Sequence, residues 1–205
     1  IGSSLVGSEM CIRDRGGLAT TQNKKLAKSM DLARSHGITR DPMLYEDPSH
    51  GSWYYEQITL GFNYRMTELQ AALGLSQMKR LKEIVDRRTA LAARYDKLLV
   101  NLPVQRPIQA PSTGSSWHLY VIQVPQNHHS QIFDYLKRAG IGVNIHYIPI
   151  HRHPYYRSMG FKLGQFPNAE SYYSKSISIP LYFGLTEKDQ DKVCATLEQC
   201  FLRIT

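Results

Sequence analysis

Residues 60–81, which read LGFNYRMTELQAALGLSQMKRL, contain the clearest fold signal in the sequence. Thr67 and Gln70 form a capping-box pattern, in which each side chain accepts a hydrogen bond from the backbone N–H of the other residue at the start of a helix. Apolar residues continue at helical spacing beyond this cap toward Leu102. The pattern predicts one long helix over residues 67–102 that connects two structural units.

Upstream of this helix, the sequence predicts short elements around a long loop. Residues 18–21 are compatible with a strand, and Asn23 is a suitable N-cap for a helix that stops at Gly37. Residues 38–65 combine Asp-Pro turns, a glycine and a group of aromatic residues. Long loops of this kind are often functional, so this part of the chain is a good place for ligand-binding side chains.

Downstream of the helix, three prolines and a Ser-Thr-Gly-rich stretch mark the change to a second unit. Strands are predicted at residues 117–124, 143–148 and 177–179, and helices at residues 130–138, 167–175 and 186–203. Ser130 and Thr186 are the expected N-caps of two of these helices. Strands that alternate with helices predict an α/β unit.

The composition is that of an ordinary globular protein, with 42% hydrophobic and 20% charged residues in a chain of 205. Lys and Arg exceed Asp and Glu by 25 to 17, which suits anionic ligands such as phosphates and nucleotide diphosphates. The basic residues are scattered without a recognition motif, so we expect no nucleic-acid partner. The sequence has no run of about 18 apolar residues and no signal-peptide pattern, so we expect a cytoplasmic protein with no membrane partner.

The first segment, residues 1–15, reads IGSSLVGSEMCIRDR and shows neither helical nor strand periodicity. Its residues 5–14, LVGSEMCIRD, look like the in-frame translation of an adapter used in sequencing libraries. The alternative is a natural flexible terminus. We interpret the segment as non-native and exclude it from the fold prediction.

The loop just before the Thr67 cap holds the first candidate site. Asn63 can donate an amide hydrogen bond to a phosphate oxygen, and the planar guanidinium of Arg65 can bind a phosphate or diphosphate with two parallel hydrogen bonds. The start of a helix also favours anions. The structural alternative is an asparagine that satisfies its own turn and an arginine that pairs with a nearby carboxylate.

A second candidate site lies in residues 144–153, NIHYIPIHRH. If this segment is a strand, alternation places His146 on one face and Tyr147 on the other. The histidines could bind phosphate or sugar hydroxyls, and Tyr147 could stack on a base. A zinc site built from His146, His151 and His153 is the alternative, but no nearby Cys or acidic residue completes a known ligand spacing, so we expect no metal.

Seven blocks that follow one another in the chain together resemble one family, the DegT/StrS sugar aminotransferases. They are GGLATT at Gly16, RSHGITRD at Arg34, WYYEQ at Trp53, LGFNYRMTELQAALGLSQMKRL at Leu60, SSWHLY at Ser115, NIHYIPIHRHPYYRSMGF at Asn144 and ISIPLYFGLTEKDQ at Ile177. The resemblance covers the chain from Gly16 to its C-terminus.

The resemblance implies a type I aminotransferase fold of the α/β class, with pyridoxal 5'-phosphate as cofactor and a homodimer whose active sites lie at the interface. Residues 16–66 would be the end of the large cofactor domain. Residues 67–102 would be the helix between the domains, and residues 103–205 would be the small C-terminal domain.

The resemblance also assigns roles to individual residues. Asn63 matches the family's loop asparagine, which reaches the cofactor phosphate of the neighbouring subunit, and Tyr64 and Arg65 would contact the nucleotide-sugar beside it. His146 and Tyr147 match the family's substrate-side pair. His151 matches the surrounding motif and is a further substrate-binding candidate.

The lysine that carries the cofactor lies, in this family, a few residues before a Glu-Gly-Gly run, of which Gly16 and Gly17 look like the end. No lysine occurs before Lys24, and no other side chain can replace it. We therefore expect the chain to be a C-terminal fragment without a catalytic residue of its own and without activity when alone.

The implied reaction of the intact enzyme is transfer of an amino group from glutamate to the C4 ketone of a UDP-4-keto-6-deoxy-N-acetylhexosamine, for pseudaminic acid or a related surface glycan. Two alternatives are another keto-sugar aminotransferase and a pyridoxal-phosphate-dependent sugar dehydratase of the same family. A third, from another class, is a non-enzymatic module that binds acidic ligands, which the net charge of +8 favours.

Overall fold

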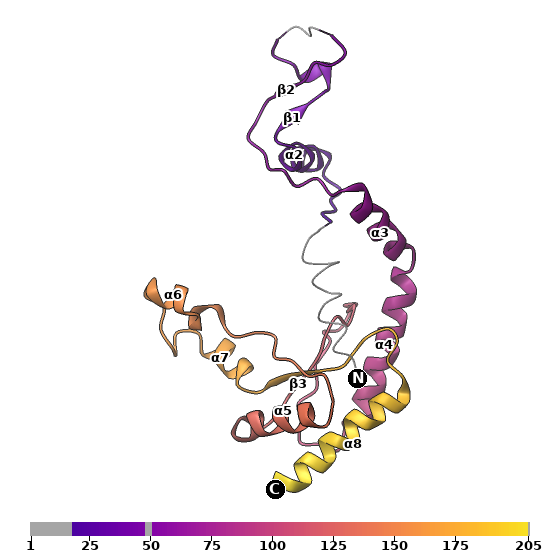
Figure 1. Ribbon diagram of the computed structural model, residues 1–205, viewed down its shortest axis with the longest axis vertical. Coiled ribbons are helices and arrows are strands. Elements are labelled where there is room, and N and C mark those ends of the chain that lie inside the picture. The colour runs from indigo at the N-terminus through magenta and orange to yellow at the C-terminus, as the bar shows by residue number, and fades with distance from the viewer. Residues whose placement is uncertain (1–17, 48–50, 205) are drawn as a thin grey trace. The chain divides into compact units, whose positions relative to one another are not determined.

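The computed structural model describes residues 18–47 and 51–204, and Figure 1 labels their elements. The adapter-like segment 1–15 and the glycine pair Gly16 and Gly17 lie outside the described residues. The chain divides into two compact units, one that ends at Met78 and one that begins at Lys79. Each unit is described separately.

The first unit begins with helix α2 (Lys24–Arg34). The side chain of Asn23 accepts a hydrogen bond from the Leu26 N–H at 3.1 Å and so caps the helix as predicted. At its other end, Gly37 adopts a φ of +70° and donates its N–H to the Leu32 carbonyl at 2.8 Å, as expected of a glycine that ends a helix. The strand predicted at residues 18–21 is wrong, because these residues form no strand in the structure.

A short hairpin follows α2. Strand β1 (Ile38–Thr39) and strand β2 (Glu56–Gln57) are antiparallel, and a 3-10 turn, η1 (Pro42–Leu44), lies between them. The carboxylate of Glu56 holds the returning chain, since it accepts the N–H groups of Glu46 at 2.7 Å and Asp47 at 3.0 Å and the Tyr54 hydroxyl at 2.9 Å. The hydrogen bond to Glu56 raises the pKa of Tyr54 to about 12. Hydrogen bonds to one carboxylate thus hold the described residues of this hairpin together.

The helical region after the hairpin is divided, whereas the sequence predicted one helix over residues 67–102. Helix α3 (Glu68–Lys79) ends before Arg80, whose φ of −103° and ψ of 4° are not helical, and helix α4 (Leu81–Leu98) begins after it. The capping box is confirmed, because Thr67 Oγ1 accepts the Gln70 N–H at 3.3 Å and Gln70 Oε1 accepts the Thr67 N–H at 3.1 Å. None of the α3 residues is buried, while α4 buries three.

The second unit is built on an antiparallel pair of strands, β3 (Tyr120–Gln123) and β4 (Ser176–Ile179). Helix α5 (His129–Arg138) and helix α8 (Glu187–Ile204) lie side by side, and α8 also contacts α4 (Figure 1). Buried apolar side chains from all these elements form one core. The predicted α/β character of this unit is confirmed.

Two predicted elements of the second unit differ in the structure. The strand predicted at residues 143–148 is wrong, because only Asn144 forms a bridge, with Ser178 of β4, and the residues beyond it leave the sheet edge. Helix α5 starts at His129 rather than after a Ser130 cap, since a 3-10 turn, η2 (Gln126–His128), precedes it directly. Local β propensity does not make a strand unless a partner strand continues beside it.

The remaining elements of this unit are short. They are the 3-10 turn η3 (Ile150–Arg152), helix α6 (Pro154–Ser158) and the predicted helix α7 (Pro167–Tyr173). No helix in the described part of the chain combines the length and the apolar character that a bilayer crossing requires.

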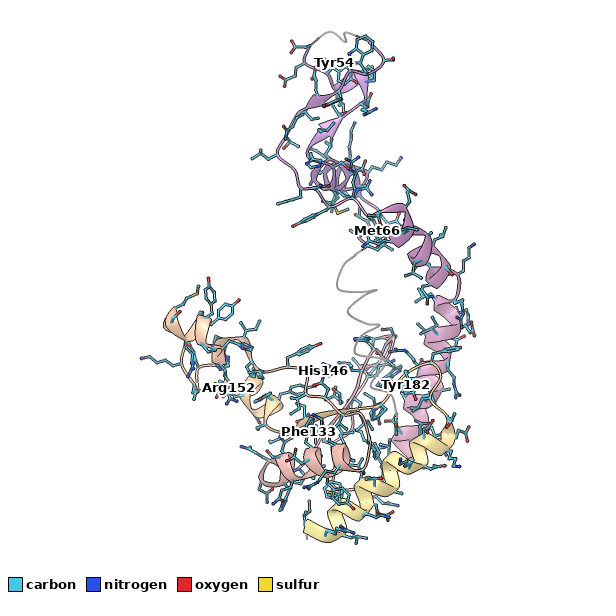
Figure 2. The ribbon with its side chains drawn as sticks, in the orientation of Figure 1. Tyr54, Met66, Phe133, His146, Arg152 and Tyr182 are labelled. Atoms are coloured by element: carbon cyan, nitrogen blue, oxygen red, sulfur yellow. The ribbon has the colours of Figure 1, made fainter. Side chains whose placement is uncertain are left out.

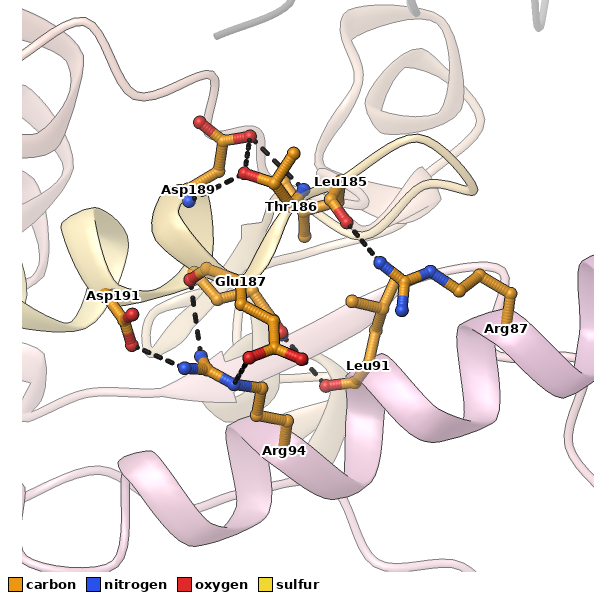
Figure 3. A network of polar contacts seen from close by, with 9 residues as sticks. Arg87, Leu91, Arg94, Leu185, Thr186, Glu187, Asp189 and Asp191 are labelled. Carbon is orange, nitrogen blue, oxygen red and sulfur yellow. Dashed lines mark hydrogen bonds and ion pairs between the residues drawn. The ribbon is translucent and has the colours of Figure 1, made fainter.

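Polar contacts join the start of α8 to α4 (Figure 3). Arg94 pairs with Asp191 at 2.8 Å, Arg87 donates to the Leu185 carbonyl at 2.8 Å, and the buried Gln190 amide donates to the Leu91 carbonyl at 2.9 Å. Thr186 caps α8 as predicted, because its hydroxyl oxygen accepts the Asp189 N–H at 3.1 Å. These contacts set the position of α8 against the core.

Candidate functional site

The loop that carries Asn63 and Arg65 is fixed by its backbone. Its residues hydrogen-bond to the end of α2: His36 donates its N–H to the Phe62 carbonyl at 2.9 Å, and Tyr64 donates to the Arg34 carbonyl at 3.0 Å. Ser35 and Asn63 form a bridge between the two segments. The loop therefore has a defined place in the first unit although it is not part of a helix or sheet.

Gly61 makes this close approach possible. A Cβ atom at this position would lie 2.2 Å from the Gly37 nitrogen and 2.5 Å from the His36 carbonyl carbon. Both are backbone atoms that cannot move aside without opening the contact. Only glycine fits at this point of the loop.

A cavity of about 360 Å³ lies beside this loop, lined by Ser35, Ile38, Arg40, Tyr55 and Arg65. Among the described residues, this lining contains two arginines and no acidic side chain. Neither arginine forms an ion pair with any residue between 18 and 47 or between 51 and 204. The alternative in which Arg65 is paired with a carboxylate therefore finds no support in the described residues, and the cavity is electrostatically suited to phosphate.

Asn63 and Tyr64 are exposed on the same loop. The side-chain amide of Asn63 makes no hydrogen bond to the part of the chain that the structure describes, so it can bind an outside acceptor. The Tyr64 ring stacks on Phe62 with the ring centroids 4.9 Å apart. An exposed amide on the loop that also carries Arg65 is chemically suited to a phosphate group.

His146 and Tyr147 lie next to β4 in the second unit, and Figure 2 labels His146. Its Nδ1 is 2.7 Å from the Ser178 hydroxyl, so the ring is half-buried and held against the strand. The Tyr147 ring is 65% exposed and stands edge-on to His146, with the centroids 4.7 Å apart. The expected division into one inward and one outward side chain is therefore present, although the segment is not a strand.

His151 is buried, with 7% of the residue exposed. Its Nε2 lies 2.8 Å from Oε1 of Glu170 in α7, and the same oxygen accepts the Gly164 N–H at 2.8 Å. The hydrogen bond from His151 lowers the pKa of Glu170. The Phe166 ring covers the imidazole at a centroid distance of 4.9 Å. In this arrangement His151 joins η3 to α7 and is not open to a ligand.

The histidines do not gather around a metal. Among the described residues, no group of three or more His, Cys, Asp or Glu side chains is placed to hold a metal ion. His153 is exposed while His151 is held by Glu170, and Arg152 between them lies over the Tyr173 ring at 5.0 Å (Figure 2). His151 is thus engaged by Glu170, whereas His153 is exposed.

The structure also shows candidate residues that the sequence did not indicate. Arg40 and Tyr55 line the cavity of Arg65 from positions that are far from it in the chain. Glu170 is the partner of His151 across 19 residues. Arg40 and Tyr55 lie in two of the blocks that resemble the family, RSHGITRD and WYYEQ, but the sequence pattern assigned neither of them a role. Glu170 lies outside the quoted blocks.

The sequence model of the DegT/DnrJ/EryC1/StrS aminotransferase family matches residues 9–198. The chain belongs to this family. It is 38% identical over 185 residues to the spore coat polysaccharide biosynthesis protein SpsC of Bacillus subtilis, a match over 87% of this chain and 47% of the relative. It is 37% identical over 180 residues to the uncharacterized protein MJ1066 of Methanocaldococcus jannaschii, over 85% of this chain and 46% of that protein.

Solved structures of sugar aminotransferases are similar to this chain. The PMP form of the putative sugar aminotransferase Spr1654 from Streptococcus pneumoniae matches with a TM-score of 0.80 and 25% identity over 92% of this chain and 48% of that one. Helicobacter pylori PseC, an aminotransferase involved in the biosynthesis of pseudoaminic acid, matches with a TM-score of 0.76 and 27% identity over 89% of this chain and 48% of PseC.

These matches confirm the fold class. The matched family is a pyridoxal-phosphate-dependent aminotransferase family of fold type I, and structures of the putative Streptococcus sugar aminotransferase are known in PMP and PLP forms. Pyridoxal phosphate is accordingly the cofactor of the family. The chain spans about half the length of the curated relatives that it matches.

Proposed function

We propose that the protein to which this chain belongs transfers an amino group from glutamate to the C4 ketone of a UDP-4-keto-6-deoxy-N-acetylhexosamine. The product would be UDP-4-amino-4,6-dideoxy-N-acetyl-β-L-altrosamine, for pseudaminic acid or a related surface glycan. Membership of the DegT family and the similarity to PseC and SpsC support this choice. The observation that carries it is the cavity of Arg40 and Arg65 beside Asn63, which suits phosphorylated ligands.

The chain's own residues would bind and orient the reactants. Bound pyridoxal phosphate supplies the electron sink that amino transfer requires. We assign Asn63 to its phosphate, in the neighbouring subunit of a dimer, and Tyr64 and Arg65 to the nucleotide-sugar. His146 and Tyr147 would contact the sugar side of the substrate.

His151 has a different role in this proposal from the direct substrate contact that the sequence predicted. Its burial and its hydrogen bond to Glu170 leave no open edge for a ligand. We assign it to support of the segment that carries His146 and Tyr147, through the link between η3 and α7.

A second copy of the protein is the partner that we propose. The loop before α3 and the helix itself expose large apolar side chains, including Leu60 at 91%, Leu69 at 86% and Leu75 at 62%. Exposed apolar surface of this extent usually marks a protein interface. In a homodimer this surface would be covered and Asn63 would be delivered to the other subunit.

The cofactor lysine would come from a part of the protein upstream of this chain. Among the described residues, no lysine lines the cavity near Asn63, and Lys24 and Lys25 are exposed in α2. On this proposal, the chain has no transaminase activity by itself. A stoichiometric absorbance band with pyridoxal phosphate that disappears on mutation of one lysine of the chain would contradict this part of the proposal.

We propose a cytoplasmic location. Both described cysteines, Cys194 and Cys200, are free thiols, which is usual for proteins of reducing compartments. Burial raises the pKa of the Cys194 thiol to about 12. The thiol is therefore unreactive and has a place in the core of the second unit.

The test of the proposed function is conversion of substrate by the longer gene product. We expect it to consume glutamate and form an amino sugar from a UDP-4-keto sugar when pyridoxal phosphate is present, with the product identified by mass and by NMR. Loss of a sugar hydroxyl without consumption of glutamate would indicate a dehydratase. Binding of single-stranded oligonucleotides in preference to UDP-sugars would contradict an enzyme of this class.

A further inference from the structure

We propose that Arg40 is a second diphosphate-binding residue and that Arg40 and Arg65 together bind the two phosphates of a nucleoside diphosphate. The inference deepens the proposed function and rests on it. The sequence indicated Arg65 alone. The structure brings the two arginines, 25 positions apart in the chain, to the lining of one cavity of about 360 Å³.

The backbone around Arg40 is well fixed. Arg40 directly follows β1, whose Thr39 is buried, and the pairing of Thr39 with Glu56 holds the strand in register. The side-chain amide of Gln57 donates to the His36 carbonyl at 2.9 Å and so joins the two ends of the hairpin. Because the loop of Arg65 is hydrogen-bonded to the same segment of backbone, the distance between the two arginines is set by the fold of the first unit.

The Tyr55 ring supports the Arg40 side chain. The guanidinium carbon lies 5.8 Å from the ring centroid, within the range of a cation–π contact. Such a contact restricts the long side chain and leaves its N–H groups available. Tyr55 therefore prepares Arg40 to bind an acceptor at low entropic cost.

The nearby carboxylates are already engaged. Asp41 accepts the Met43 N–H at 3.1 Å and lies 3.8 Å from the Lys28 ammonium. Asp31 pairs with Arg34 on the outside of α2. Glu56 accepts the hydrogen bonds that close the hairpin. None of these acidic groups lines the cavity, so its positive charge is available to an anion.

Tyr55 lines two cavities whose described lining residues differ in charge. The second cavity, of about 480 Å³, is also lined by Glu46, Asp47 and Glu56. A phosphate is attracted to the cavity of the arginines and repelled from the cavity of the carboxylates. The arrangement restricts a diphosphate to the cavity of Arg40 and Arg65.

Two guanidiniums favour a diphosphate over a single phosphate. Each can bind one phosphate with two parallel hydrogen bonds, and a cavity of this size lies in the range of small-molecule sites. A monophosphate such as that of pyridoxal phosphate can satisfy only one of them fully. We therefore expect the affinity order UDP, then UMP, then uridine.

The experiment is calorimetric titration of the chain with UDP, UMP, uridine and pyridoxal phosphate. We expect Arg40→Gln and Arg65→Gln each to weaken UDP binding by about tenfold, because each removes hydrogen bonds from a charged group. Arg40→Lys should retain part of the affinity, because it keeps the charge and loses the paired geometry. Arg138→Gln, at an exposed arginine in the last turn of α5, is the matched control and should bind UDP normally. Circular dichroism checks that each variant is folded.

Three outcomes would overturn the inference. The first is that Arg40→Gln binds UDP as tightly as the unsubstituted chain does. The second is that the unsubstituted chain does not bind UDP. The third is that Arg40→Gln loses as much affinity for pyridoxal phosphate as for UDP. The proposed function is tested separately by amino-sugar formation in the longer protein. The two proposals can fail separately. If UDP binding depends on Arg40 but the longer protein forms no amino sugar, the diphosphate site is supported and the transaminase function is refuted.

Discussion

The two units of this chain are stabilised in different ways. The second unit has one continuous core, in which Tyr95, Tyr120, Ile132 and Leu197 are fully buried. In the described part of the first unit, only Gly37 and Thr39 are buried, and hydrogen bonds to backbone groups and to Glu56 hold the chain. The cavity lined by Arg40 and Arg65 therefore lies in the unit whose described residues bury the least apolar surface.

The difference has a physical basis. Burial of apolar surface is the main favourable contribution to folding, whereas a surface hydrogen bond contributes little net stability because water competes for the same groups. The second unit thus has a core of its own among its described residues. The first unit leaves α3 and its preceding loop exposed, and we propose that a second subunit covers this surface.

The largest change in unfolding free energy is expected at a buried position of the second unit. Leu197→Ala in α8 should lower the free energy of unfolding by about 2–5 kcal/mol, because it leaves a cavity at a fully buried position. Leu69→Ala in α3, where the side chain is exposed, should change it by less than about 0.5 kcal/mol. Urea unfolding of the chain measures both, and a comparable loss for Leu69→Ala would show that α3 is already covered.

A pair of glycines tests the backbone of the first unit. Gly61→Ala should destabilise this unit by about 1–3 kcal/mol, because the added methyl group meets backbone atoms of Gly37 and His36, and it should weaken UDP binding. Gly74→Ala in α3, where the methyl group meets nothing within 4 Å, should stabilise the helix by about 0.5–1 kcal/mol. Hydrogen exchange of the hairpin amides distinguishes the two, and a harmless Gly61→Ala would argue against the close approach.

Two threonine helix caps of the same kind should differ in their effect on stability, because one lies in each unit. Thr186→Ala should cost about 1 kcal/mol in unfolding of the second unit, because its cap supports a helix that is part of the core. Thr67→Ala removes an equivalent cap from α3, a helix without buried residues. We expect it to reduce helicity measured by circular dichroism while the cooperative unfolding transition stays in place. A shift of that transition by Thr67→Ala equal to that of Thr186→Ala would contradict the expectation.

The smallest effect concerns acid stability. Hydrogen bonds lower the pKa of Glu170 in the second unit and of Glu56 in the first from the ordinary value of 4.5. A carboxyl group whose pKa is lowered in the folded state stabilises that state above its ordinary pKa, and this contribution is lost as the pH falls through the lowered value. Glu170→Gln should therefore flatten the dependence of Tm on pH below about 4.5. If the dependence of Tm on pH is the same in Glu170→Gln as in the unsubstituted chain, the hydrogen bond to His151 does not stabilise the folded state in this way.

Local patterns in the sequence were reliable where a few neighbouring residues decide the structure. The caps at Asn23, Thr67 and Thr186 were predicted correctly, because each depends on a hydrogen bond within three residues. The strand predicted at residues 143–148 was wrong, because its apolar residues lack a continuous partner strand. The predicted long helix is divided at Arg80, whose backbone is not helical, although apolar residues recur before and after this position.

The candidate site shows the same division. Asn63 and Arg65 became candidates from their place before a helix cap, and the resemblance to the DegT family suggested their roles, which stay predictions. Arg40 lies in the RSHGITRD block, but its place beside Arg65 depends on contacts between segments that are distant in the chain. The partner of His151 was likewise hidden, because Glu170 lies in another helix.

The sequence by itself determined the family, the α/β class and the helix caps at Asn23, Thr67 and Thr186. These depend on residue types and on short spacings that remain the same before and after folding. The tertiary structure decided which unit has a core, how Arg40 joins Arg65 and why His151 faces Glu170. Such relations depend on contacts between distant segments, and these contacts form only when burial and backbone hydrogen bonds bring the segments together.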